Sequence, residues 1–126
     1  MLILVLFEWG TDMTATSDKE QIGTSDLAKS LMKNEKFSKY FSLQQEMIKF
    51  AVCVAIKNKI EPVTDEKSIT NSQHTAALDP DGDLKFLIMS YKNTQTPYKL
   101  VEQLAEAGFR FIKGKLDKNQ MIEDCF

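Results

Sequence analysis

The sequence predicts an all-α fold, a single-domain bundle of about four helices around a buried central helix at about residues 42–58. Three observations favour this class. The chain has 126 residues, the length of one domain, and its 43% hydrophobic and 27% charged residues are typical of a globular protein. Four segments carry apolar residues at helical spacing. In one of them, residues 50–56 are all apolar, and a helix that is apolar on every side is a buried helix.

Residues 1–23 are predicted to form a disordered or docked N-terminal arm. Residues 1–9, MLILVLFEW, are too short to span a bilayer and lack the basic start of a signal peptide. They are either a strand or apolar arm docked on the core, or the product of a misassigned start. The polar stretch that begins at Met13 is typical of a disordered N-terminus, which favours Met13 as the true first residue.

The helical domain is predicted to span residues 24–117, and its first helix to span residues 26–34. Ser25 stands directly before this helix, in a Thr-Ser-Asp run that is a common capping pattern. One face of the helix is apolar, and an aromatic hinge leads from it into the central helix. These residues are Leu27, Ala28, Leu31, Met32, Phe37, Tyr40 and Phe41.

The central helix is expected to begin with a capping box. In this pattern the Ser42 hydroxyl accepts a bond from an early backbone N–H and Gln45 reaches back. Glu61-Pro62 stops the helix, because a residue before proline is pushed out of helical geometry. Lys57 and Lys59, shortly before that stop, suit the negative end of the helix dipole.

Residues 63–78 are polar and unperiodic, which predicts a long exposed loop. An Asp-rich turn follows at residues 79–83. Its spacing differs from that of a calcium-binding EF-hand loop, because Gly82 stands fourth and Ser90 occupies the place of the final glutamate. We therefore interpret it as a solvated turn in which Asp83 caps the next helix.

The third helix is predicted over about 84–92 and the fourth over about 97–116. Thr96 is the expected cap of the fourth helix, with proline at its first position. Residues 118–126 are predicted to form a frayed C-terminal tail. The expected core faces comprise Leu84, Leu87, Ile88 and Tyr91 in the third helix, and Leu100, Val101, Leu104, Ala105, Gly108, Phe111, Ile112 and Leu116 in the fourth.

Gly108 is an unfavourable residue for the interior of the fourth helix, where it costs about 1 kcal/mol relative to alanine. A close approach between backbones would explain it, because glycine has no Cβ. We expect that approach to be made to the Ala51/Ala55 side of the central helix.

The sequence gives no indication of an enzyme. It has no Gly-rich phosphate loop, no HExxH and no GxSxG. His74 is the only histidine, and two cysteines cannot form a zinc site without more ligands. We expect Cys53 to be a buried thiol and Cys125 a loose terminal one, in a reducing compartment. The prediction is a cytoplasmic, non-enzymatic protein without metal or cofactor. An unrecognised catalytic site in residues 65–83 is the third-ranked alternative.

Charge alternates along a chain whose formal net charge is −2. Residues 26–60 carry seven lysines against three carboxylates, and residues 61–83 carry one lysine against six carboxylates. The acidic block suits a basic partner surface. Most of the lysines flank the first two helices, and a hairpin of these helices would bring several of them onto one positive face. The candidate nucleic-acid contacts are Lys29, Lys33, Lys36, Lys39, Lys57 and Lys59.

Such a face would bind DNA through its phosphates, so binding would be non-specific and sensitive to salt. Arg110 is the only arginine, which argues against base-edge readout because arginine to guanine is the commonest specific contact. The competing interpretation is that the lysines form an ordinary solvated helix surface.

Two segments resemble parts of a known family. One is 46–62, EMIKFAVCVAIKNKIEP, which resembles the central helix of small proteins encoded beside bacterial DNA-phosphorothioation (Dnd) defence genes. The other is 100–116, LVEQLAEAGFRFIKGKL, which is similar to a later helix of that family. The resemblance implies a cytoplasmic bacterial protein with an accessory role in an anti-phage restriction locus, beside larger enzymes. It implies no functional residues.

Two function hypotheses follow. The first is a non-enzymatic accessory or adaptor protein that docks on a larger protein partner, in a bacterial DNA-modification or anti-phage defence complex. The alternative is a direct, largely non-specific DNA-binding module that uses the lysine-rich helical face. Neither hypothesis places the chain in a membrane, and both leave the oligomeric state open.

Overall fold

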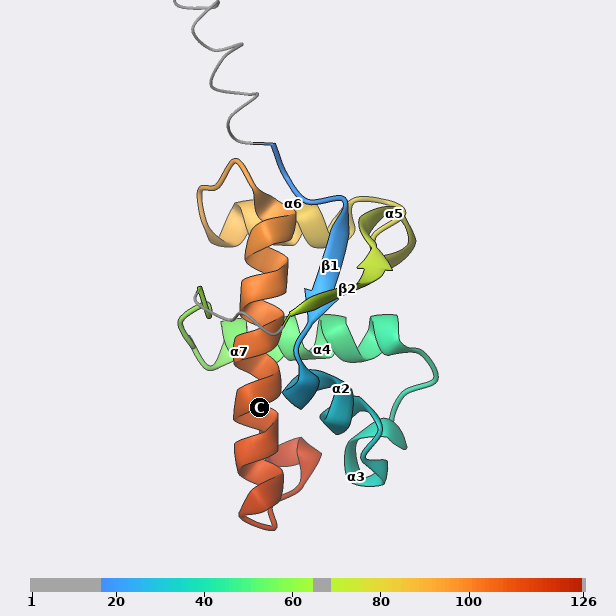
Figure 1. Ribbon diagram of the computed structural model, residues 1–126. Helices are drawn as coiled ribbons and strands as arrows, with labels where there is room; N and C mark the ends of the chain where they lie inside the picture. Colours follow the sequence, from blue (N-terminus) through green and yellow to red (C-terminus); the bar gives the residue numbers. More distant parts are fainter. Residues whose placement is uncertain (1–16, 65–68, 126) are drawn as a thin grey trace, which may run out of the picture.

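A computed structural model describes residues 17–64 and 69–125. Within these residues the fold is mixed: 60% of them are helical, in six α-helices and a short 3₁₀ helix, and a small two-stranded antiparallel sheet is also present (Figure 1). The predicted all-α class is therefore wrong, although the structure is mostly helical. The expectations for residues 1–16, including a start at Met13, fall outside the described residues.

The core lies where two long helices, α4 (Gln44–Lys57) and α7 (Pro97–Asp117), cross (Figure 1). Gly108 sits at the crossing. A Cβ added there would lie 1.9 Å from the carbonyl oxygen of Ala51, a distance that no real Cβ contact shows. Only glycine allows the two backbones to approach this closely, so the expected reason for Gly108 is confirmed.

The central helix, α4, is not buried on all sides. Lys49, Cys53 and Lys57 are exposed. These three residues follow one another at intervals of four, so they share the helix face that points away from the core. The expectation for the two thiols is wrong in both directions, because Cys53 is exposed and Cys125 is buried.

The start of α4 also differs from the expected capping box. Glu46 Oε1 accepts hydrogen bonds from the backbone N–H groups of Ser42 and Leu43, at 2.8 and 3.1 Å. The predicted pair of Ser42 and Gln45 does not form this cap. The backbone N–H groups that precede the helix are bonded by a carboxylate inside its first turn, rather than N–H groups inside the helix by a side chain that precedes it.

The sheet pairs β1 (Gln21–Thr24) with β2 (Thr70–His74), antiparallel and with a register shift between Ile22 and Gly23. Residues 21–23 were predicted to belong to a disordered or docked arm and residues 70–74 to a long exposed loop. The structure docks the first segment on the core and forms a strand from each, and neither strand was predicted. β2 is mostly exposed and carries no apolar alternation, so no periodic pattern marks it as a strand.

Two buried glutamates of α7 hold β1 and the residues around it against the helix. Glu102 Oε2 accepts from the backbone N–H of Gly23 at 2.7 Å and from Lys19 Nζ at 2.6 Å. Glu106 accepts from Ser25 Oγ at 2.6 Å and pairs with Arg110 Nε at 3.0 Å. Apart from these polar anchors, α7 buries a stripe of apolar residues against the core.

The remaining elements surround this core. They are α2 (Asp26–Met32), α3 (Glu35–Ser38), α5 (Thr75–Leu78), α6 (Asp83–Tyr91) and the 3₁₀ helix η1 (Ile122–Cys125). Ser25 caps α2 as predicted, because its Oγ accepts from the backbone N–H of Ala28 at 3.1 Å. The aromatic hinge is also a packing centre: Phe37 is buried and contacts the rings of Phe41, Phe50 and Phe109.

Carboxylates from outside α6 and α7 cap both helices. Asp79 accepts from the backbone N–H groups of Leu84 and Lys85, at 2.9 Å each. Asp18 accepts from the backbone N–H groups at the start of α7, those of residues 98 and 99, at 2.8 and 3.0 Å. The predicted caps Asp83 and Thr96 make no side-chain capping bond.

The described part of the C-terminal tail packs on the core rather than fraying. Ile122 and Cys125 in η1 are buried. Asn58, at the end of α4, donates from Nδ2 to the carbonyl oxygen of Cys125 at 2.7 Å. The tail therefore closes the lower end of the molecule in Figure 1.

Candidate protein-docking surface

Helix α6 buries only part of its apolar surface. Leu84 and Ile88 are buried, whereas Leu87 and Tyr91, which were expected in the core, are about 40% exposed. The sequence 86–89 is Phe-Leu-Ile-Met, four consecutive apolar residues on a nine-residue helix. One face of a helix cannot bury four consecutive residues, because successive residues are about 100° apart around the axis.

The exposed apolar residues of α6 form what we call the α6 face. Phe86 is 74% exposed and Met89 is 50% exposed. These two are three residues apart and are therefore neighbours on the outward side of the helix. Leu87 and Tyr91, four residues apart, flank them beside the buried pair. Surface patches of this kind mark interaction sites more often than single exposed apolar residues do.

Charged residues stand at both ends of α6. Asp81 and Asp83 are exposed at its start, beside Lys85 in the first turn, and Lys92 is exposed at its end. We call the start, which carries two carboxylates and one lysine, the acidic end of α6. A hollow of about 270 Å³ lies beside the acidic end, between α4 and α6. Its lining residues are Lys49, Cys53, Asp79, Pro80, Asp81, Asp83, Leu84 and Leu87.

Asp79 fixes the acidic end of α6 to α7. Tyr98, in the first turn of α7, donates its hydroxyl to Asp79 Oδ2 at 2.9 Å. Burial alone raises the pKa of the Asp79 carboxyl, but hydrogen bonds from Leu84, Lys85 and Tyr98 and the charge of Lys49 bring that pKa below its ordinary value. The α6 face is therefore presented on a fixed helix, which lowers the entropic cost of binding.

The hydrogen bond between Tyr98 and Asp79 also affects the pKa of the Tyr98 hydroxyl. Burial, the hydrogen bond to Asp79, and the charges of Asp79 and Asp18 raise the pKa of Tyr98 to about 12. The phenol therefore keeps its proton, and the bond to Asp79, well above neutral pH. In the Asp-rich turn, Asp79 is the residue that caps α6. In the described residues no three His, Cys, Asp or Glu side chains are grouped so that they could hold a metal ion.

The candidate lysines are divided among three places. Lys29 donates from Nζ to the carbonyl oxygen of Thr24 at 2.7 Å and to Thr70 Oγ1, so it joins the two strands of the sheet. The other five are exposed: Lys33, Lys36 and Lys39 belong to the α2–α3 region, and Lys57 and Lys59 to the end of α4.

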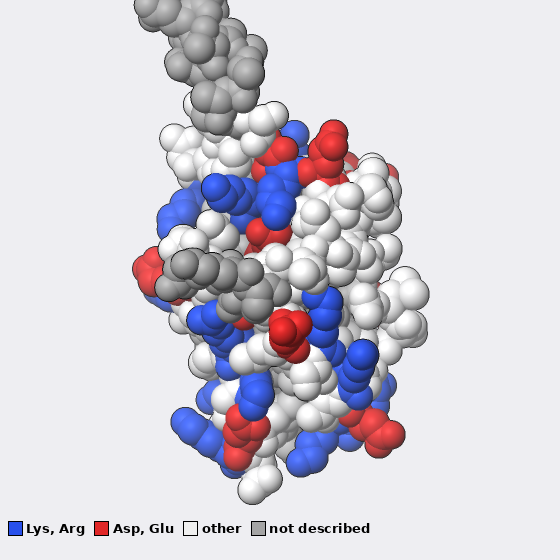
Figure 2. All heavy atoms as spheres, in the orientation of Figure 1, with Lys and Arg blue, Asp and Glu red and all other residues white. Residues whose placement is uncertain are grey.

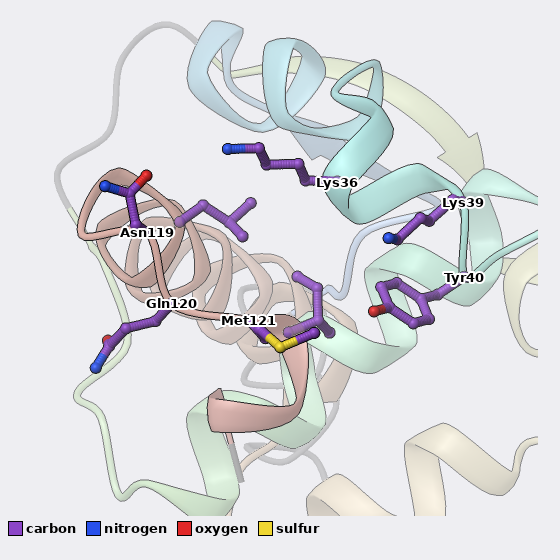
Figure 3. A pocket seen from close by; sticks show the side chains of 8 residues that line it. Lys36, Lys39, Tyr40, Asn119, Gln120 and Met121 are labelled. Carbon is purple, nitrogen blue, oxygen red and sulfur yellow. The ribbon is translucent and has the colours of Figure 1, made fainter.

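The structure does not bring these lysines onto one face. The α2–α3 region and the end of α4 lie on opposite sides of α7 in Figure 1. Figure 2 shows basic and acidic side chains interspersed over the visible face. Two of the lysines, Lys36 and Lys39, line the same groove, between α3 and the end of α7 (Figure 3).

Comparisons with known proteins add no assignment, because no family model, no curated protein and no solved structure matches the chain. Among the helices of residues 17–64 and 69–125, none combines the length and the hydropathy that crossing a membrane requires. The choice of candidate site therefore rests only on the exposed residues of α6 and their surroundings. Sequence reasoning missed the α6 face, although the run of four apolar residues was a usable signal.

Proposed function

We propose that this protein is a non-enzymatic adaptor that docks on a larger protein through the α6 face. The observation that carries the proposal is the exposure of Phe86, at 74%, beside Met89, at 50%, on a helix whose start is fixed to α7. Burying one such side chain completely is worth about 1.5–3 kcal/mol. Large apolar anchors of this kind supply much of the affinity of protein interfaces.

The two charged ends of α6 define the partner further. Its docking surface is apolar at the centre, with basic groups opposite Asp81 and Asp83 and an acidic group opposite Lys92. Charges at the rim contribute orientation and association rate more than affinity. The order of these charges therefore favours one direction of α6 on its partner.

The resemblance of residues 46–62 and 100–116 to the Dnd-associated proteins supports a place beside larger DNA-modifying enzymes in the bacterial cytoplasm. An accessory role of that kind needs a docking surface and no catalytic residues of its own. The exposed α6 face supports docking on a partner, and the resemblance supports the kind of complex in which that partner is found.

The test compares three forms of the tagged protein as bait: the wild type, Phe86→Ser with Met89→Ser, and Leu43→Ser. Leu43 is a matched control, because it is 55% exposed but lies at the start of α4. A protein retained by the wild type and by the control, but not by the α6 variant, is then purified and titrated calorimetrically. We expect a negative heat-capacity change, the mark of apolar burial, and an affinity at least tenfold weaker for the α6 variant.

Equal retention of the same partner by all three forms would contradict the proposal, as would failure to retain any protein. The DNA alternative stays a prediction and is measured in parallel. A salt-sensitive gel shift of duplex DNA that is weakened by Lys33→Glu with Lys57→Glu, and unchanged by the α6 variant, would favour that alternative.

A further inference from the structure

A second hollow lies away from α6, near the other end of α7. It is a groove of about 220 Å³ between α3, the last turn of α7 and η1 (Figure 3). Its lining residues are Lys36, Lys39, Tyr40, Leu116, Asn119, Gln120, Met121 and Ile122. We call it the η1 groove.

The η1 groove has an apolar floor and a basic rim. Leu116 and Ile122 are nearly buried, at 8% and 6% exposure, and Met121 beside them is 57% exposed. Lys36 and Lys39 extend from the α3 side, whereas Asn119 and Gln120 stand on the α7 side (Figure 3). None of the lining residues is a carboxylate, although the Glu123 carboxylate accepts from the hydroxyl of the lining residue Tyr40 at 3.3 Å.

Backbone bonds hold the wall of the groove in place. Asn119 has a φ of 60°, and its N–H donates to the carbonyl oxygen of Leu116 at 3.0 Å, which reverses the chain after α7. The next N–H, of Gln120, donates to the carbonyl oxygen of Lys115 at 3.0 Å. Met121 donates its backbone N–H to Asp124 Oδ2 at 2.9 Å. The groove is therefore formed before any ligand arrives.

We propose that the η1 groove binds an acidic segment of a protein, with one large apolar side chain on the floor and its neighbouring carboxylates on Lys36 and Lys39. Pockets that enclose a whole small molecule usually exceed about 300 Å³. The groove is smaller, and it suits a single side chain of a longer segment. Two ammonium groups at the rim select acidic residues on either side of that anchor.

The surroundings of Tyr40 favour a peptide over a single strand of nucleic acid. Single-strand binding needs an open aromatic face on which a base can stack. Here Lys39 Nζ lies 5.3 Å from the centre of the Tyr40 ring, and the hydroxyl is 3.3 Å from Glu123 Oε1. The Lys39 ammonium group already covers one face of the ring, so a base cannot stack there without displacing it.

This site is independent of the α6 face. The two lie near opposite ends of α7, a helix of 21 residues that extends about 30 Å. An adaptor with two separate binding surfaces can hold two partners at the same time.

The experiment uses the full chain, labelled with ¹⁵N, and a synthetic peptide with two glutamates on each side of a phenylalanine. We expect amide shifts confined to residues 36–40 and 116–122, weakened by added salt. Lys36→Glu with Lys39→Glu should weaken binding at least tenfold. Lys57→Glu with Lys59→Glu is the matched control, because it makes the same change of charge at the end of α4, and it should leave binding unchanged.

Two further ligands test whether the acidic residues of the peptide are needed and whether the groove prefers nucleic acid. A peptide with glutamines in place of the glutamates should bind at least tenfold more weakly, and so should an oligothymidylate of ten nucleotides. Absence of shifts with the acidic peptide, shifts elsewhere, equal loss in the control variant, or tighter binding of the oligonucleotide would each overturn the proposal. Far-ultraviolet circular dichroism confirms that each variant is folded.

Discussion

Helices α4 and α6 lie at different positions along α7 and use their apolar residues in different ways. At the α4 crossing, small residues let two backbones touch, and Gly108 approaches Ala51 more closely than any side chain would permit. On α6, Leu84 and Ile88 pack inward while Phe86 and Met89 point outward. Apolar residues at the crossing stabilise the fold, whereas Phe86 and Met89 on α6 add little to it and are available for binding.

The contrast has a physical basis in burial. A buried side chain contributes both its transfer from water and its close contacts with neighbours. A side chain that is 74% exposed, like Phe86, makes only a small part of either contribution in the free protein. Substitutions should therefore affect stability strongly at the crossing and weakly on the outer side of α6.

The largest effect is expected from Gly108→Ala. The new Cβ would meet backbone atoms of Ala51, which cannot move aside as a flexible side chain would. We expect a loss of about 3 kcal/mol in the free energy of unfolding, the upper part of the range for overpacked cores. Urea denaturation followed by circular dichroism measures it.

Gly114→Ala is the matched control in the same helix, because a Cβ there meets no atom within 4 Å. It should stabilise the protein by about 0.5–1 kcal/mol, the usual gain over glycine inside a helix. Equal responses of Gly108 and Gly114 would contradict the close crossing.

The next effect is expected from Asp79→Asn, which weakens the cap of α6 and the bond to Tyr98. The loss should be about 1–2 kcal/mol near neutral pH, as for other helix caps. Because the pKa of Asp79 is lowered in the folded protein, its contribution is present above the ordinary value of 3.8 and is lost as the pH falls through the lowered pKa. The difference between wild type and variant should therefore shrink in acid. Unfolding curves from pH 7 to pH 2 measure this, and a constant difference would argue against an ionised cap.

A smaller effect is expected from Tyr98→Phe, which removes one hydrogen bond worth about 1 kcal/mol. The raised pKa, about 12 in the folded protein, means that this tyrosine adds stability below its ordinary value of 10. That stability is lost as the pH rises from 10 to about 12. Stability measured from pH 8 to pH 12 should fall less steeply in the variant. Spectrophotometric titration of the wild type should show one tyrosine ionising near pH 12, absent in the variant.

Much of the helical framework could be predicted, because local patterns determine it. The predicted helices at 26–34, 84–92 and 97–116 lie within a residue or two of α2, α6 and α7. The reason for Gly108 was also available, since a glycine inside a helix needs a packing explanation.

The sheet and the caps could not be predicted, because they depend on residues far apart in the sequence. The strand at 70–74 is polar and is held by β1, some 50 residues earlier. Asp18 caps a helix 80 residues later. Closeness in sequence predicted one group of lysines, yet Lys29 joins the two strands, and the end of α4 lies across α7 from α3 in Figure 1.

The central claim, that the outer side of α6 serves binding and not folding, is tested most directly by comparing Phe86→Ser with Ile88→Ala. The two positions are neighbours on one helix, but Phe86 is 74% exposed and Ile88 is fully buried. We predict that Phe86→Ser changes the free energy of unfolding by less than about 0.5 kcal/mol. Ile88→Ala should lose at least about 2 kcal/mol. A loss for Phe86→Ser as large as that for Ile88→Ala would show that Phe86 belongs to the core and would contradict the account.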